Sequence, residues 1–171
     1  MFALTGPSGT GKSTVCRLIT AELSDHVVVV EQDVLWTAGL QDPTDHFTMF
    51  RRTWLRTAAM INQSGRPVVL CGTVVPVELE RCPERVLFSG IHYLGLMCDP
   101  EVMRARLLSR PAWRDWDEAR VAEMLDFAAW LRREAPCMDP PLTLVDTTDR
   151  PVTDTADTVA TWIRERLDRG R

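Results

Sequence analysis

The stretch GPSGTGKST, residues 6–14, decides the fold. It matches the pattern G-x-x-x-x-G-K-[ST] through Gly6, Gly11, Lys12 and Ser13. The pattern follows a short apolar run, residues 1–4, and precedes a segment with helical periodicity, which is the context that it requires. Glycines let backbone N–H groups approach an anion, and the start of a helix adds a positive end. The stretch therefore predicts a loop that binds the phosphates of a nucleoside triphosphate.

Two side chains of this loop are assigned to the phosphates and the metal. We expect Lys12 to bridge the β- and γ-phosphates and the Ser13 hydroxyl to hold Mg²⁺. Lys12 is the only lysine of the chain, and a planar guanidinium would not fit the same cradle. The other nucleotide-binding residues expected in the loop are Gly6, Ser8, Gly9, Thr10, Gly11 and Thr14.

The composition is typical of a soluble globular protein. The length of 171 residues suggests one domain, and 45% of the residues are hydrophobic. A net charge of -4 argues against a nucleic-acid partner, because duplex binders usually carry a basic face. We expect no signal peptide, and no apolar run approaches the ~18 residues of a membrane span. We therefore expect a cytoplasmic monomer or homodimer whose partner is a small molecule, with no nucleic acid and no membrane.

Cysteine and histidine positions predict no metal cluster. The five cysteines lack C-x-x-C spacing, and the three histidines lie far apart in the sequence. Because Cys71 and Cys98 lie within apolar runs, we expect reduced thiols that act as small hydrophobic groups.

Strands alternate with helices along the chain, which predicts an α/β fold with a parallel sheet covered on both faces. The expected strands are residues 1–4, 27–30, 67–70, 91–98 and 142–145. The expected helices are residues 12–23, 44–64, 77–81, 99–109, 117–134 and 153–167, and residues 110–116 are expected to form a loop.

The ends of the strands are the next candidates, because ligands of open α/β sheets lie outside the carboxyl ends. Asp33 follows the second strand and could accept a proton or hold Mg²⁺ through water, although a turn-capping role is the alternative. Glu31 is a weaker candidate for the same role. The third strand ends in Cys71, Gly72 and Thr73 without an acidic residue, which gives Asp33 more weight for the metal. Gly72 and Thr73 could admit an acceptor or form a simple turn.

Arginines surround the predicted loop after the fourth strand. Arg110 and Arg114 are expected to stabilise charge on a transferring phosphoryl group. Arg106 lies four residues before Arg110 and shares its helix face. We expect Arg104 to be solvated at the surface.

Residues after the second strand could contact the acceptor. Trp36 and Trp54 could stack on a flat ring or line an apolar pocket, and core packing is the alternative for both. Arg51, together with Arg52 and Arg56, could contact a polar or acidic acceptor or lie at the surface.

The whole chain resembles the small P-loop kinases of the nucleoside/nucleotide kinase-like superfamily, which includes shikimate, gluconate and adenylate kinases and chloramphenicol phosphotransferase. The resemblance is carried by GPSGTGKST (residues 6–14), EQD (31–33), VVLCGT (68–73) and RARLLSRPAWR (104–114). It implies a three-layer P-loop fold with five parallel strands in the order 2-3-1-4-5 and a short lid at about residues 110–116. It further implies ATP with Mg²⁺ as donor and Asp33 as the base.

The resemblance also implies where the adenine lies. It would lie between Arg106 or Arg110 and the segment 146–151, so Asp149, Arg150 and Pro151 are expected to bind nucleotide. The strand end CGT is more similar to the glycine-rich turn of shikimate kinases than to the acidic strand end of adenylate kinases.

The function expected from these residues is ATP-dependent phosphoryl transfer to a hydroxyl of a nucleoside or another small acceptor. One alternative is a nucleoside monophosphate kinase, in which Arg51, Arg52 and Arg56 would bind the acceptor phosphate. The other is a regulatory ATPase that binds nucleotide and transfers no phosphoryl group.

Overall fold

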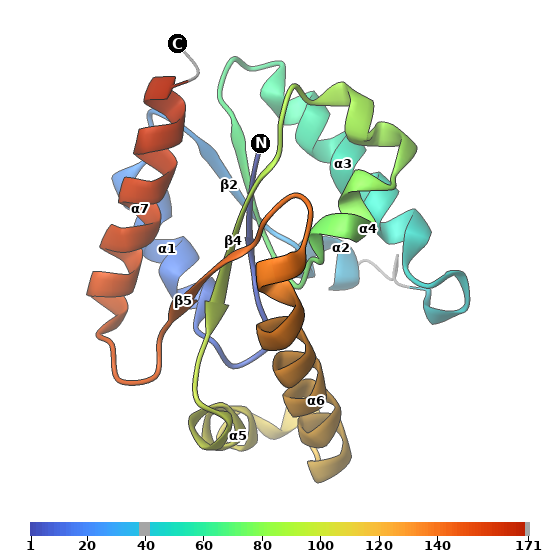
Figure 1. The fold of residues 1–171 in the computed structure, drawn as a ribbon, viewed down its shortest axis with the longest axis vertical. Coiled ribbons are helices and arrows are strands. Elements are labelled where there is room, and N and C mark those ends of the chain that lie inside the picture. Colours follow the sequence, from blue (N-terminus) through green and yellow to red (C-terminus); the bar gives the residue numbers. More distant parts are fainter. Residues whose placement is uncertain (38–41, 170–171) are drawn as a thin grey trace.

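A sheet of five parallel strands in the order β2-β3-β1-β4-β5 forms the centre of the molecule (Figure 1). The computed structural model describes residues 1–37 and 42–169. The strands are β1 (Phe2–Thr5), β2 (Val28–Glu31), β3 (Val68–Cys71), β4 (His92–Met97) and β5 (Thr143–Asp146). The predicted strand order and the parallel pairing are both confirmed.

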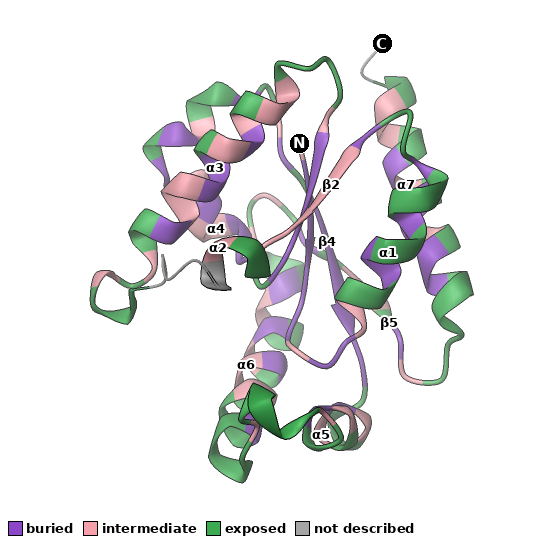
Figure 2. Cartoon of the chain, turned by 180° about the vertical axis from the view of Figure 1, so that it is seen from behind, coloured by how far each residue is buried: buried purple, intermediate pink, exposed green. Residues whose placement is uncertain are grey.

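Helices cover both faces of the sheet and divide the core into two clusters. On one face α1 (Lys12–Glu22) and α7 (Val152–Arg169) pack against Phe2 and Leu4 of β1. On the other face lie α3 (Thr48–Asn62), α4 (Pro76–Glu80), α5 (Pro100–Leu108) and α6 (Glu118–Glu134), packed around Ala3. Alternate residues of one strand thus face different layers, which explains why the residues Phe2, Ala3 and Leu4 are all apolar. Figure 2 shows the buried strand β4 and the less buried edge strand β2.

Short elements complete the described chain. They are the helix α2 (Asp33–Thr37) and the 3₁₀ turns η1 (Pro43–Asp45), η2 (Pro83–Leu87), η3 (Ala112–Arg114) and η4 (Ala135–Cys137). No helix among residues 1–37 and 42–169 is long and apolar enough to cross a membrane.

Local chemistry accounts for several helix ends. The Asp99 side chain accepts hydrogen bonds from the N–H groups of Glu101 (2.8 Å) and Val102 (3.4 Å), and Pro100 opens α5. An aspartate cap followed by proline is a strong helix start, and this prediction is confirmed.

The structure corrects one predicted element. The helix expected from residue 44 begins only at Thr48, because His46 and Phe47 have φ values of 54° and 58°, which a helix cannot contain. Asp33 follows the second strand as expected, and it begins the five-residue helix α2. Four cysteines are buried as expected, whereas Cys137 is exposed.

Candidate active site

The loop between β1 and α1 is shaped by its glycines. Gly6 has a φ of 136°, and a Cβ atom at this position would lie 2.2 Å from the Leu96 carbonyl oxygen of β4. Only glycine allows this close approach of two backbones. Gly11 caps α1 with a φ of 90°, and a Cβ atom added there would meet no heavy atom within 4 Å among the described residues, its chain neighbours aside. The positive end of α1 therefore faces open space that suits an anion.

The ammonium of Lys12 is held at this loop. Its Nζ atom donates hydrogen bonds to the carbonyl oxygens of Gly6 (2.7 Å) and Pro7 (2.8 Å). Burial lowers the pKa of Lys12 from its ordinary value, since a buried charge is poorly solvated. Among the described residues, no group accepts a hydrogen bond from the N–H of Gly9 or Gly11. A buried cation and unsatisfied N–H groups are what a polyphosphate would complement.

Contacts from distant segments hold the loop in place. The guanidinium of Arg106 donates hydrogen bonds to the carbonyl oxygens of Gly9 (3.4 Å) and Thr147 (3.1 Å). The Thr147 hydroxyl lies 3.1 Å from the Thr10 carbonyl oxygen, and the Ser8 N–H donates to the sulfur of Met124 at 3.2 Å. Arg106 and Thr147 thus connect the loop to the segment after β5. The Met124 contact was not predicted, because local sequence gives no signal for a contact across 116 residues.

A cavity of about 130 Å³ opens beside Lys12 and brings many of the predicted residues together. They come from the loop, the start of α1, the ends of β2 and β3, and the segment after α5. Its lining residues are Ser8, Gly9, Gly11, Lys12, Ser13, Thr14, Glu31, Asp33, Cys71, Gly72, Thr73 and Arg110. Glu31 therefore stands beside Asp33 at the site, and Cys71, expected only as a core thiol, forms part of the wall.

Gly72 serves a packing role within this wall. A Cβ atom there would lie 1.9 Å from the side-chain oxygen Oε1 of Gln32, and the Gly72 N–H donates to the Leu4 carbonyl oxygen (3.1 Å). The missing side chain thus makes room for Gln32. The Thr73 hydroxyl donates to the Gly6 carbonyl oxygen (3.3 Å), which links this strand end to the loop.

One arginine of the segment 110–116 lines the cavity, and another contacts a residue that lines it. Arg114 Nη1 lies 3.6 Å from Asp33 Oδ2, in an ion pair whose side chains are 46% and 64% exposed. Arg110 lines the cavity, and burial together with the nearby charge of Arg114 lowers its pKa. The segment expected to be a lid thus places its charges toward Asp33. Arg104 pairs with Glu118 at the surface (2.7 Å), as expected.

A second cavity of about 290 Å³ lies between the loop and the segment after β5. Arg110 lines both cavities and therefore stands between them. The other residues of the second cavity are Gly9, Thr10, Gly11, Thr14, Val15, Arg106, Thr147, Arg150, Val152 and Thr155.

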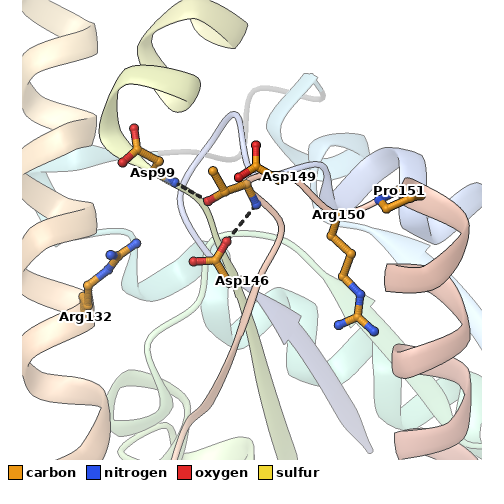
Figure 3. A pocket seen from close by; sticks show the side chains of 7 residues that line it. Asp99, Arg132, Asp146, Asp149, Arg150 and Pro151 are labelled. Carbon is orange, nitrogen blue, oxygen red and sulfur yellow. Dashed lines mark hydrogen bonds between the residues drawn. The ribbon is translucent and has the colours of Figure 1, made fainter.

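Asp149 and Pro151 instead line a neighbouring open pocket, together with Arg150 (Figure 3). In that view the Thr148 N–H donates to Asp146 (2.8 Å), and the Asp99 N–H donates to the Thr148 hydroxyl (2.8 Å). The bond from Asp99 ties the segment 146–151 to the start of α5, and the bond between Thr148 and Asp146 lies within the segment.

Two of the residues expected to contact an acceptor, Trp54 and Arg51, contact other residues of the protein. Trp54 is 2% exposed and packs edge-on against Phe50, with ring centroids 6.5 Å apart. This burial corrects the expectation of an acceptor contact, because the inward face of α3 serves the core. Arg51 pairs with Glu78 (3.4 Å). The side chain of Trp36 lies outside the described part of the structure.

Arg52 and Arg56 share one carboxylate. Glu84, 7% exposed, lies 3.0 Å from Arg52 Nε and 2.7 Å from Arg56 Nη2. Both arginines are therefore engaged in joining α3 to η2. Among the parts of the chain that the structure describes, no group of histidine, cysteine or acidic residues has the arrangement of a metal cluster.

Comparison with known proteins identifies the family. Residues 3–126 match the family described as AAA domain. A shikimate kinase from Chlorobaculum tepidum is 32% identical over 141 residues, which are 73% of this chain and 73% of the relative.

Solved structures share the fold. A gluconokinase from Sinorhizobium meliloti 1021 matches with a TM-score of 0.62 at 19% identity, over 97% of this chain and 94% of that one. A shikimate kinase from Bacteroides thetaiotaomicron matches with a TM-score of 0.59 at 19% identity, over 95% and 97%. Together with the sequence relative and the loop, these matches show that the chain belongs to the AAA domain family and is a small P-loop kinase, an ATP-dependent phosphotransferase.

Proposed function

We propose that this kinase transfers the γ-phosphoryl group of ATP to a hydroxyl group of a small molecule bound beside Asp33. One observation carries the proposal: Asp33 lines the same cavity as Lys12 and Ser13. A proton acceptor and the phosphate-binding groups thus face one space, which is the arrangement that phosphoryl transfer to a hydroxyl requires.

The residues present fit ATP and Mg²⁺. The triphosphate would lie along the N–H groups of the loop and against Lys12. Oxygen atoms of Ser13, Asp33 and Glu31 are the hard ligands that Mg²⁺ prefers, with Ser13 holding the ion and Asp33 acting through water. When bound, the ion neutralises charge on the phosphate oxygens.

The protein side chains then divide the reaction between them. Asp33 accepts the proton of the acceptor hydroxyl while the oxygen of that hydroxyl forms the new bond to the γ-phosphorus. The bond from that phosphorus to the bridging β–γ oxygen breaks, and ADP leaves. Lys12, Arg110 and Arg114 stabilise the charge spread over the transferring group. Arg114 must exchange its ion pair with Asp33 for the phosphoryl group during the reaction.

The nucleoside of ATP is proposed to occupy the second cavity. Arg106 and Arg150 flank this space, and Arg110 joins it to the first cavity. Guanidinium groups stack favourably on planar rings, which suits an adenine.

The acceptor is proposed to be a nucleoside or another small hydroxyl compound. The names of the relatives make shikimate and gluconate the first acids to test. A nucleoside monophosphate is less well supported, because Arg52 and Arg56 are paired with Glu84 rather than directed at a phosphate.

A product screen tests the proposal. The protein is incubated with ATP, Mg²⁺ and pools of nucleosides, nucleotides, sugars and hydroxy acids, and products are detected by mass spectrometry. We expect a product heavier by one phosphoryl group, formed by the wild type and greatly reduced in Asp33→Asn. Slow phosphate release with no phosphorylated product would instead indicate a regulatory ATPase.

A further inference from the structure

Two guanidinium groups lie over the ring of Trp116 where the lid joins α6. The Cζ atom of Arg110 lies 5.3 Å from the centroid of the Trp116 ring, and that of Arg120 lies 4.6 Å from it. Both distances fall within the roughly 6 Å at which a cation is attracted to an aromatic face. Trp116 itself is partly buried against the core and immediately precedes Asp117, the N-cap of α6.

Arg120 holds this arrangement from the helix side. Its Nη1 atom donates hydrogen bonds to the carbonyl oxygens of Arg114 (3.0 Å) and Asp115. Its own N–H donates to the Asp117 carboxylate (2.8 Å), which is the helix cap. The ring is therefore fixed relative to the first turn of α6 and to the end of the lid.

Of these two arginines, Arg110 is the one that lies at the site. It lines both the cavity beside Lys12 and the cavity assigned to the nucleoside. A long arginine side chain has many rotamers. A stacking contact that already restricts them lowers the conformational entropy that the side chain loses when it binds a phosphate.

We propose that Trp116 is a positioning residue for phosphoryl transfer, which holds the Arg110 guanidinium between the two cavities while Arg120 holds the ring. This inference rests on the proposed function. Trp116 does not touch the reacting atoms; it acts through Arg110. Because misplacement of a charged group by about 1 Å can lower a rate by about 10²-fold, a support of this kind is large enough to matter.

The lid contains a second tryptophan that does not share this position. Trp113 is 75% exposed and stacks on Arg114, with the Cζ atom 4.5 Å from its ring centroid. A matched control away from both cavities exists on α7, where Arg166 lies 4.5 Å from the ring centroid of Trp162. Trp162→Leu removes the same kind of contact without approaching the site.

The test compares binding of ADP with binding of ADP–aluminium fluoride–Mg²⁺, a mimic of the transferring phosphoryl group, by calorimetry. We expect Trp116→Leu to weaken the mimic about tenfold and ADP less than about twofold, since the contact supports a charge that only the mimic uses. Trp116→Phe keeps an aromatic face, so its affinity for the mimic should be close to that of the wild type. Trp162→Leu should leave the ratio of the two affinities unchanged.

Each other outcome has a clear meaning. An unchanged ratio in Trp116→Leu, or no rescue by Trp116→Phe, overturns the positioning role while phosphoryl transfer stands. Equal loss of both affinities shows a purely structural role and also overturns it. If the wild type binds the mimic no more tightly than ADP, the proposed function fails and the role of Trp116 fails with it.

Discussion

The phosphate loop and the lid are held in contrasting ways, although both contribute to one cavity. The loop is held through its own backbone atoms: Gly6 approaches the Leu96 carbonyl, and the carbonyl oxygens of Gly6 and Pro7 hold Lys12. Side chains of distant segments also bond to backbone groups of the loop, as Arg106 and Thr147 do. The lid is positioned by side chains, and its ion pair between Arg114 and Asp33 spans 3.6 Å with both partners substantially exposed. Backbone geometry resists change, whereas exposed ion pairs exchange partners at little cost.

This difference suggests a division between the two halves of the site. The donor half is formed before ATP arrives, and the acceptor half is completed by charges that must change partners. Substitutions in the loop should therefore affect folding and nucleotide binding, and substitutions around the lid should affect turnover.

The largest expected effect is that of Asp33→Asn. An amide cannot accept the proton of the acceptor hydroxyl, so kcat should fall by about 10²- to 10⁴-fold. ATP affinity should be nearly unchanged, because the loop holds the phosphates without Asp33. Steady-state kinetics with the acceptor found in the product screen measures the first effect, and calorimetry measures the second.

Asp126→Asn on the exposed face of α6 provides the control for this substitution and should behave as the wild type. Unchanged turnover in Asp33→Asn would remove Asp33 from the mechanism and with it the division between the two halves.

The second prediction concerns the arginine shared by both cavities. Arg110→Met should lower kcat by about 10²- to 10³-fold, the usual effect of removing one group that stabilises transition-state charge. Arg104→Met is the matched control, since its ion pair with Glu118 lies at the surface and should be worth little. Equal loss in both variants, measured by kcat at saturating ATP, would show that the effect is not specific to the site.

Much of the fold could be predicted because its signals are local. Apolar runs marked the strands, and an aspartate followed by proline marked the start of α5. The strand order came from the resemblance to P-loop kinases. The helix break at His46 and Phe47 was missed, because neither residue type requires a positive φ.

The site residues also fall into those that local sequence could predict and those that it could not. The loop residues Gly6–Ser13 could be assigned from their spacing, and Asp33 from its place after a strand. The pairing of Arg52 and Arg56 with Glu84 could not, because it joins residues 28 and 32 positions apart and depends on how η2 packs on α3. Trp54 was ambiguous, since one helical periodicity is compatible with both a core face and a pocket wall.

A third prediction tests the rigidity of the loop. Gly6→Ala should lower the free energy of unfolding by about 3 kcal/mol, because the new Cβ overlaps the Leu96 carbonyl and φ is positive. Gly65 also has a positive φ, 84°, but a Cβ atom there would meet open space. Gly65→Ala should therefore lower the free energy of unfolding by only about 1 kcal/mol. Urea unfolding of both variants measures the difference. Equal losses would mean that the close approach at Gly6 contributes nothing and that the donor half is less rigid than inferred.

The smallest expected effect concerns Glu84, whose carboxylate joins η2 to α3. Burial raises the pKa of Glu84, but hydrogen bonds from its own backbone and from Arg52 and Arg56 outweigh it, so the pKa lies below the ordinary value of 4.5. A carboxylate whose pKa is lowered by folding stabilises the folded protein at pH values above its unfolded-state pKa. This contribution is lost as the pH falls through the lower, folded-state pKa.

The melting temperature of the wild type should therefore exceed that of Glu84→Gln at neutral pH, and the difference should shrink as the pH falls below about 4.5. Glu118→Gln is the exposed control, 64% exposed in its pair with Arg104, and should show little difference at any pH. A difference that does not change with pH would mean that packing, not charge, supports this side of the molecule. ATP affinity of Glu84→Gln at neutral pH should equal that of the wild type, because none of the loop contacts described above comes from α3. A weaker affinity would instead show that the loop is mechanically coupled to α3.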